Sequence, residues 1–193
     1  YSTTGTDSQT ACDSYTWIDG NTYISSTNSP INNTYTLYSN SQNPRGLNND
    51  LEYPFGSGLD PSWTVILGPN QSNPSWSSNQ IIPFYFEFNG NSVTHYKVSS
   101  TGVLTFDTAT TLLPGHINTS IPNNQVPNNS IMVWGIQGTG SNDNIVTKTF
   151  GSIGNRQYWV FFSSYTAGSW TYWSIVIEET TNKIYIVDQR HSG

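Results

Sequence analysis

The residue types that carry out acid–base or metal chemistry are sparse in this chain. Its three histidines, His95, His116 and His191, are scattered, and none has the His-x-Glu or His-x-x-x-His spacing that brings two ligands to one metal ion. Serine is frequent, but no serine stands in a Gly-x-Ser-x-Gly nucleophile elbow. The sequence therefore predicts neither a histidine metal site nor a serine hydrolase.

Two adjacent carboxylates, Glu178 and Glu179, follow an apolar run. Neighbouring side chains of a strand point to opposite faces of its sheet, so this pair cannot flank one sugar bond as the two carboxyl groups of a glycosidase do. No other arrangement of acids, bases and nucleophiles indicates a reaction centre. We therefore expect a protein that is not an enzyme.

Three aspartates, Asp13, Asp19 and Asp143, stand in segments rich in Asn, Ser and Gly. Such turns offer side-chain and carbonyl oxygens, which Ca²⁺ prefers as ligands, but no Asp-x-Asp-x-Asp-Gly loop is present. Two alternatives stay open, a chain without a cofactor and a chain that binds Ca²⁺.

Tryptophan gives the sharper question about binding. Most tryptophans are expected in the core, because aromatic rings supply much of the buried area, but an exposed ring beside amides can also hold a sugar. Trp76 lies between serines, and Trp170 follows a Gly-Ser pair, so these two are the candidates for exposed, ligand-binding rings. The tryptophans in or beside predicted strands are Trp63, Trp76, Trp134, Trp159, Trp170 and Trp173.

Composition excludes several partners. With a net charge of −6 and only 6 lysines and arginines, the chain offers no basic stripe for a nucleic acid. No apolar run approaches the roughly 18 residues of a membrane span, so no membrane insertion is expected. Abundant Asn, Thr and aromatic residues, few lysines and a polar start at Tyr1 without a basic leader favour a secreted, extracellular or cell-surface protein.

Strand signals cover the chain, whereas no window repeats apolar residues with helical spacing. The predicted strands are β-branched or aromatic runs bounded by Gly, Asn, Pro and Ser. They are Tyr15–Ile18, Tyr23–Ser25, Thr34–Tyr38, Trp63–Leu67, Ile81–Phe88, Val93–Val98, Val103–Phe106, Ile131–Ile136, Ile145–Phe150, Gln157–Phe162, Trp170–Ile177 and Lys183–Val187. Hairpins are expected at Asp19-Gly20, at Asn89-Gly90 and at the corner Thr180–Asn182, which tolerate positive φ.

These strands predict an all-β fold, an antiparallel two-sheet sandwich of jelly-roll type with a small N-terminal hairpin module. Alternation places Trp173, Ile175 and Ile177 on one face, and we expect Trp134 to join that packed face. The consecutively apolar runs 156–162 and 184–187 are expected in central strands, buried on both faces.

The chain divides into three parts. Residues 1–39 are expected to form the N-terminal β module, residues 40–60 a linker or packed loop, and residues 61–193 the sandwich. Only Asp188–Gly193 follow the apolar run Lys183–Val187. If these residues are all that is present, we expect an incomplete sandwich with an open sheet edge beside that run. Open edges recruit other strands, so either a continuation of the chain or a strand of another copy is expected to cover it.

The N-terminal segment resembles a short repeat of giant secreted adhesin-like proteins of Bacteroidota-type bacteria. The resemblance is carried by Ala11-Cys12-Asp13-Ser14-Tyr15-Thr16-Trp17 and Asp19-Gly20-Asn21-Thr22-Tyr23. That repeat pairs its first cysteine with a second one in a later Gly-Cys-Asp segment. This sequence has no second cysteine, so the resemblance implies a diverged copy with a free thiol at Cys12.

The segment from Trp63 to Gly193 is similar to a sandwich domain of the same surface proteins. The similarity implies an exported protein of the type IX secretion route. It also brings an Asp-Ser/Thr-aliphatic acceptor pattern for O-glycosylation, so Thr108 is a candidate with a bare turn as the alternative. The matching segments are 84–91, 98–106, 121–124, 131–134, 155–160 and 177–184.

Together these observations predict a non-catalytic structural or adhesive display module of a larger secreted surface protein. The alternatives are a carbohydrate-binding module and an accessory domain of a secreted hydrolase. The expected partners are a surface glycan or other copies of the chain at the open edge.

Overall fold

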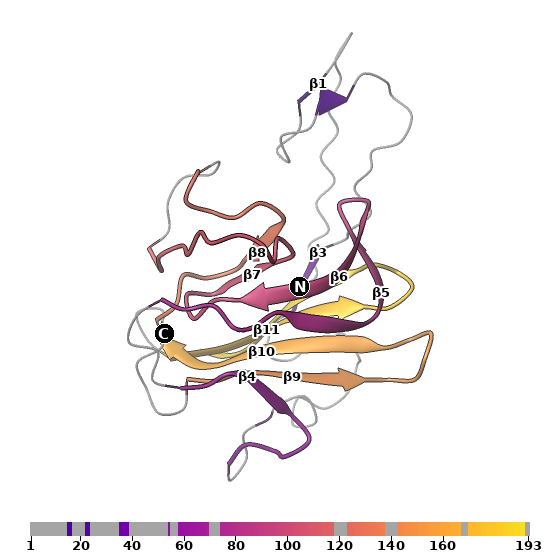
Figure 1. Ribbon diagram of the computed structural model, residues 1–193. Coiled ribbons are helices and arrows are strands. Elements are labelled where there is room, and N and C mark those ends of the chain that lie inside the picture. Colours follow the sequence, from indigo (N-terminus) through magenta and orange to yellow (C-terminus); the bar gives the residue numbers. More distant parts are fainter. Residues whose placement is uncertain are drawn as a thin grey trace.

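The computed structural model in Figure 1 describes residues 15–16, 22–23, 35–38, 54, 58–69, 74–117, 123–137, 143–166 and 170–191. Every regular element in these ranges is a strand, and no described helix is long and apolar enough to cross a membrane. The strands are β1 (Tyr15–Thr16), β2 (Thr22–Tyr23), β3 (Tyr35–Tyr38), β4 (Thr64–Leu67), β5 (Gln80–Phe88), β6 (Asn91–Val98), β7 (Val103–Thr105), β8 (Ser130–Met132), β9 (Ile145–Phe150), β10 (Gln157–Thr166), β11 (Trp170–Glu178) and β12 (Ile184–His191). Each one overlaps a strand predicted from the sequence.

The strands form two stacked sheets, which confirms the predicted sandwich. A four-stranded sheet, in the order β5-β6-β7-β8, lies over a six-stranded sheet, in the order β3-β12-β11-β10-β9-β4 (Figure 1). Consecutive strands β5 to β8 and β9 to β12 are each neighbours, so both sheets are built around meanders. The strands β1 and β2 pair with each other in a separate small sheet.

The predicted reversals have the backbone that hairpins need. Asn89 and Gly90 have φ of 49° and 73° between β5 and β6, and two positive φ values in succession are the mark of a type I′ turn. Thr180 and Asn182, between β11 and β12, also have positive φ. Asp19-Gly20 lies outside the described residues.

The core lies between the two sheets and continues on the outer face of the larger one. Trp173, Ile175 and Ile177 are at most 3% exposed and belong to the inter-sheet cluster, as predicted. In the central strand β10, alternate residues bury into two clusters. Tyr158, Val160 and Phe162 face the other sheet, and Trp159 and Phe161 join the second cluster. The prediction that this run is buried on both faces is confirmed.

The prediction for Trp134 is wrong, because its side chain is 38% exposed. Strand β8 ends at Met132, earlier than expected, and Ile131 and Val133 point toward the core. Since side chains alternate along an extended chain, Trp134 shares the solvent side with Met132.

The expected open edge beside Ile184–Val187 is also wrong. Strand β3 pairs with β12 in parallel over these residues, in the register Ile184↔Tyr35 to Val187↔Tyr38. Residues that the sequence assigns to the N-terminal module therefore complete the larger sheet. The division of the chain near residue 39 stays a prediction.

Candidate binding site

A hollow of about 640 Å³ opens at one end of the four-stranded sheet, where β7 begins and β8 ends. Its volume falls in the range of small-ligand sites. We call this hollow the groove. Its described lining residues are Thr101, Gly102, Val103, Pro114, Gly115, His116, Ile117, Gln125, Val126, Met132, Val133, Trp134 and Gly135.

One wall of the groove belongs to an extended segment, Thr110–Ile117, that we call the strap. Three side chains, one from β6 and two from the segments before β5 and after β6, hold its backbone at every second carbonyl. Lys97 Nζ donates to the Thr110 carbonyl, Trp76 Nε1 to that of Leu112 (3.0 Å) and Thr101 Oγ1 to that of Pro114 (2.9 Å). Alternate carbonyls of an extended chain point the same way, so these three bonds fix one edge of the strap.

Lys97 is buried beneath this contact, with 7% exposure. Its ammonium lies 4.9 Å from the centre of the Trp76 ring, and a cation is attracted to the face of an indole. A buried charge needs such compensation. Trp76, half-buried, thus has its ring and its N–H both engaged in holding the strap, and it is not among the residues that line the groove.

The floor of the groove is a tight turn, Ser99–Gly102, between β6 and β7. Ser99 Oγ lies 2.7 Å from Thr101 Oγ1 within the turn. Gly102 has φ of +92°, and a Cβ placed there would meet the Trp134 carbonyl oxygen at 2.1 Å. Only glycine allows the backbone carrying Trp134 to lie this close to the turn.

The groove combines exposed apolar side chains with uncharged polar groups. Ile117 is 74% exposed, and Met132 and Trp134 are 38% exposed each. Within the described part of the chain, the side chains of His116 and Gln125 have no hydrogen-bond partner, and no Lys, Arg, Asp or Glu lines the groove. The site therefore suits an uncharged ligand that has both an apolar face and hydrogen-bonding groups.

Of the other residues singled out in the sequence, those whose side chains the structure describes, Thr108 and Asp143, do not line the groove. Trp170 begins β11, but its side chain is outside the described residues, as are Cys12, Asp13 and Asp19. Thr108 lies half-buried in a turn that the bond from Thr110 N to the Asp107 carbonyl closes. Asp143 is 3% exposed. Among the residues described, no three His, Cys, Asp or Glu side chains gather as metal ligands would.

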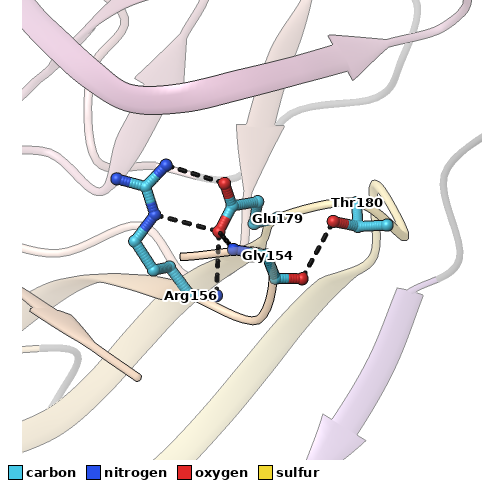
Figure 2. Close-up of polar contacts among 4 residues, drawn as sticks. All are labelled: Gly154, Arg156, Glu179 and Thr180. Atoms are coloured by element: carbon cyan, nitrogen blue, oxygen red, sulfur yellow. Dashed lines mark hydrogen bonds and ion pairs between the residues drawn. The ribbon is translucent and has the colours of Figure 1, made fainter. Parts of the chain in front are cut away.

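The adjacent carboxylates bind different neighbours. Glu179 receives a two-pronged contact from Arg156, through Nε at 2.9 Å and Nη2 at 2.7 Å, and its Oε2 also accepts from the Gly154 N–H at 2.8 Å (Figure 2). The hydrogen bonds of Arg156, helped by the Gly154 N–H, lower the pKa of Glu179 to about 2. Its carboxylate fastens the turn before β10 to the turn after β11.

Glu178 points to a separate group of donors. Hydrogen bonds reach it from Gln157 (2.9 Å), Thr181 (2.7 Å) and Tyr185 (3.0 Å). Burial raises the pKa of Glu178, but these bonds and the charge of Lys183 outweigh burial and leave the pKa below its ordinary value. The two carboxylates thus have separate structural partners, Glu178 at the end of β11 and Glu179 in the turn that follows.

A second hollow, of about 540 Å³, lies where the edges of the sheets meet at β4, β5 and β9. Lys148 on its rim donates to Ser62 Oγ at 2.7 Å. Its lining is mostly hydroxyl and amide, and Tyr158 of the core reaches it from β10. Through this hollow the core residue Tyr158 has access to solvent.

Sequence reasoning missed the groove because its members carry no motif. The sequence pattern predicts Trp134 in the core, His116 is isolated in the sequence, and Gln125 lies in a loop. One pattern in the sequence indicates the exposure of Trp134. If Ile131 and Val133 face the core, the alternation of side chains along the chain places Trp134 on the solvent face of the sheet.

Comparison with protein families places residues 61–193, from β4 to β12 and including the whole groove, in one family. A comparison with curated proteins and one with solved structures found no match. The family match begins after the segment 11–23, so the likeness of that segment to an adhesin repeat stays a prediction. NIDO-related domains are typically extracellular modules of larger proteins. Because the match covers well over half of the chain, the chain belongs to the NIDO-related family.

Proposed function

We propose that the chain is a non-catalytic adhesive module of an extracellular surface protein and that it holds its ligand in the groove. The observation that carries this proposal is the groove itself, in which an exposed Trp134 lies among the lining residues together with the polar side chains of His116 and Gln125. Exposed aromatic rings at a concave site are frequent centres of binding energy.

The chemistry of the groove favours binding over catalysis. Among the described lining residues, His116 is the single titratable one, and none is a carboxylate or part of a nucleophilic pair. The acidic pair Glu178 and Glu179 is committed to neighbouring turns and strands. The described lining therefore offers no second group that could act with His116 as an acid, a base or a nucleophile.

Display at a cell surface agrees with the family and with the composition of the chain. Only 9% of the residues are charged, and Asn and Thr are abundant, a composition that favours an extracellular protein. The likeness of 11–23 to a surface-adhesin repeat supports display on a long protein, with type IX secretion as the corresponding export route.

Adhesion of coated beads under flow tests the proposal. Beads carrying the 193-residue chain are passed over surfaces coated with neutral glycans, acidic glycans or deglycosylated extracellular proteins. We expect adhesion to at least one surface, its loss in Trp134→Ala, and its retention in Tyr85→Ala. Tyr85 is a matched control because it is an aromatic residue of the same sheet, 65% exposed and outside the groove. Adhesion to no surface, or equal adhesion by the Trp134→Ala chain, would contradict the proposal.

A further inference from the structure

We infer that the ligand of the groove is a neutral carbohydrate, with the Trp134 indole covering the apolar face of one sugar ring while His116 and Gln125 bond its hydroxyls. This inference rests on the proposed adhesive function and names the substrate class of the same site. Three properties of the groove lead to it.

The first property is the pairing of a flat apolar surface with neutral hydrogen-bonding groups. An indole is rigid and amphipathic, so it can cover the C–H face of a pyranose at low entropic cost. An amide offers two donors and an acceptor, and a neutral imidazole offers one of each. Sugar hydroxyls both donate and accept, so Gln125 and His116 match them better than a carboxylate or an ammonium would.

The second property is charge. No described residue of the groove is Lys, Arg, Asp or Glu, and the whole chain carries −6. Sialylated, sulfated or phosphorylated sugars need positive groups to offset their charge, and the described lining of the groove offers none. Lys97, a described cation near the site, is buried under the strap, where it is bonded to the Thr110 carbonyl. The groove therefore selects neutral over acidic glycans.

The third property is rigidity. The strap is fixed by the side chains of Lys97, Trp76 and Thr101, and the turn below it packs against the Trp134 backbone. Sugar hydroxyls exchange bonds with water for bonds with protein at little net gain, so a site that must also order itself would bind poorly. Because the wall and floor of the groove are already formed, ligand binding has a smaller entropic cost of ordering the site.

A glycan array followed by calorimetry with the full chain tests the inference. Wild type should bind neutral oligosaccharides and not their sialylated or sulfated forms. Trp134→Ala should weaken binding roughly tenfold or more, and Trp134→Phe should recover part of the loss. Gln125→Ala should weaken binding several-fold, and Tyr85→Ala should leave it unchanged. Unfolding curves of each variant show whether the fold is intact.

The alternatives give different results. A preference for acidic glycans, or neutral-glycan binding that Trp134→Ala leaves intact, would overturn the inference. Adhesion to deglycosylated protein alone, with loss in Trp134→Ala, would overturn the carbohydrate assignment and keep the adhesive function. Binding to neither class of surface would reject both.

Discussion

The hydroxyl oxygens of Tyr96 and Tyr158 lie 2.9 Å apart and form a hydrogen bond between the two sheets, through the core. Tyr96, from β6, is 1% exposed, whereas Tyr158, from β10, is 8% exposed and borders the hollow at the sheet edges. Burial is the main cause that raises the pKa of Tyr96 well above 10. The two partners therefore differ in their access to water.

The two phenylalanine variants should differ in stability. Tyr158→Phe leaves the Tyr96 hydroxyl buried without a partner, which costs about 1–3 kcal/mol. Tyr96→Phe leaves a Tyr158 hydroxyl that can turn toward solvent, so its loss should be smaller, about 0.5–1.5 kcal/mol. Urea unfolding measures both free energies. A larger loss for Tyr96→Phe would show that water does not reach Tyr158.

Ile175 provides the test of the inter-sheet core. It is 0% exposed, so Ile175→Ala leaves a cavity and should lower the free energy of unfolding by about 2–5 kcal/mol. The matched control is Ile153→Ala, because Ile153 is 85% exposed, and its change should stay within about 0.5 kcal/mol. A loss below about 1 kcal/mol for Ile175→Ala would contradict its place in the core.

Alanine substitutions at two glycines distinguish the cost of backbone strain from the cost of a steric clash. Gly102 and Gly154 have nearly equal φ, +92° and +90°, but a Cβ at Gly154 would meet nothing within 4 Å. Gly154→Ala should cost only the strain of a positive φ, about 1–2 kcal/mol. Gly102→Ala must also move the Trp134 backbone, so it should destabilise more and should weaken ligand binding. Equal unfolding free energies for the two variants would contradict this account of the floor.

Acid should weaken the contact between Arg156 and Glu179. A carboxyl whose pKa falls from 4.5 in the unfolded chain to about 2 in the folded chain stabilises the fold fully above pH 4.5. That stability declines as the pH falls from 4.5 toward 2. Urea midpoints of wild type and Glu179→Gln, measured between pH 7 and 2, should converge at the acid end. A constant difference across this range would contradict the lowered pKa.

Loss of the Trp76 N–H should reduce the local stability of the strap more than the global stability of the fold. Trp76→Phe keeps a ring beside Lys97 but removes the bond to the Leu112 carbonyl. We expect a loss of about 0.5–1.5 kcal/mol together with faster hydrogen exchange and proteolysis in the strap. Unchanged protection of the strap would show that the other two bonds suffice.

The strands could be predicted because their information is local. In β11 the alternation of Trp173, Ile175 and Ile177 fixes both the strand and its buried face. The Asn89-Gly90 turn is equally local, since the two residues themselves permit the positive φ. Neither feature depends on a distant part of the chain.

The groove could not be predicted because its geometry depends on distant partners. The strap has no periodic pattern, and its anchors Lys97, Trp76 and Thr101 lie 13, 36 and 13 residues before the carbonyls they bind. The parallel pairing of β3 with β12 likewise joins segments that no local signal relates. The prediction for Trp134 fails for a more local reason. Side chains alternate after Ile131, so Val133 faces the core and Trp134 faces solvent.

Strand β3 has a consequence for where the chain can be cut. The family match begins at residue 61, but the larger sheet is complete only with residues 35–38. A piece that starts at residue 61 would lose the neighbour of Ile184–Val187 and present bare main-chain groups there. Residues 35–38 thus shield the edge of β12, and we expect a piece cut at residue 61 to associate through that edge more readily than the 193-residue chain does.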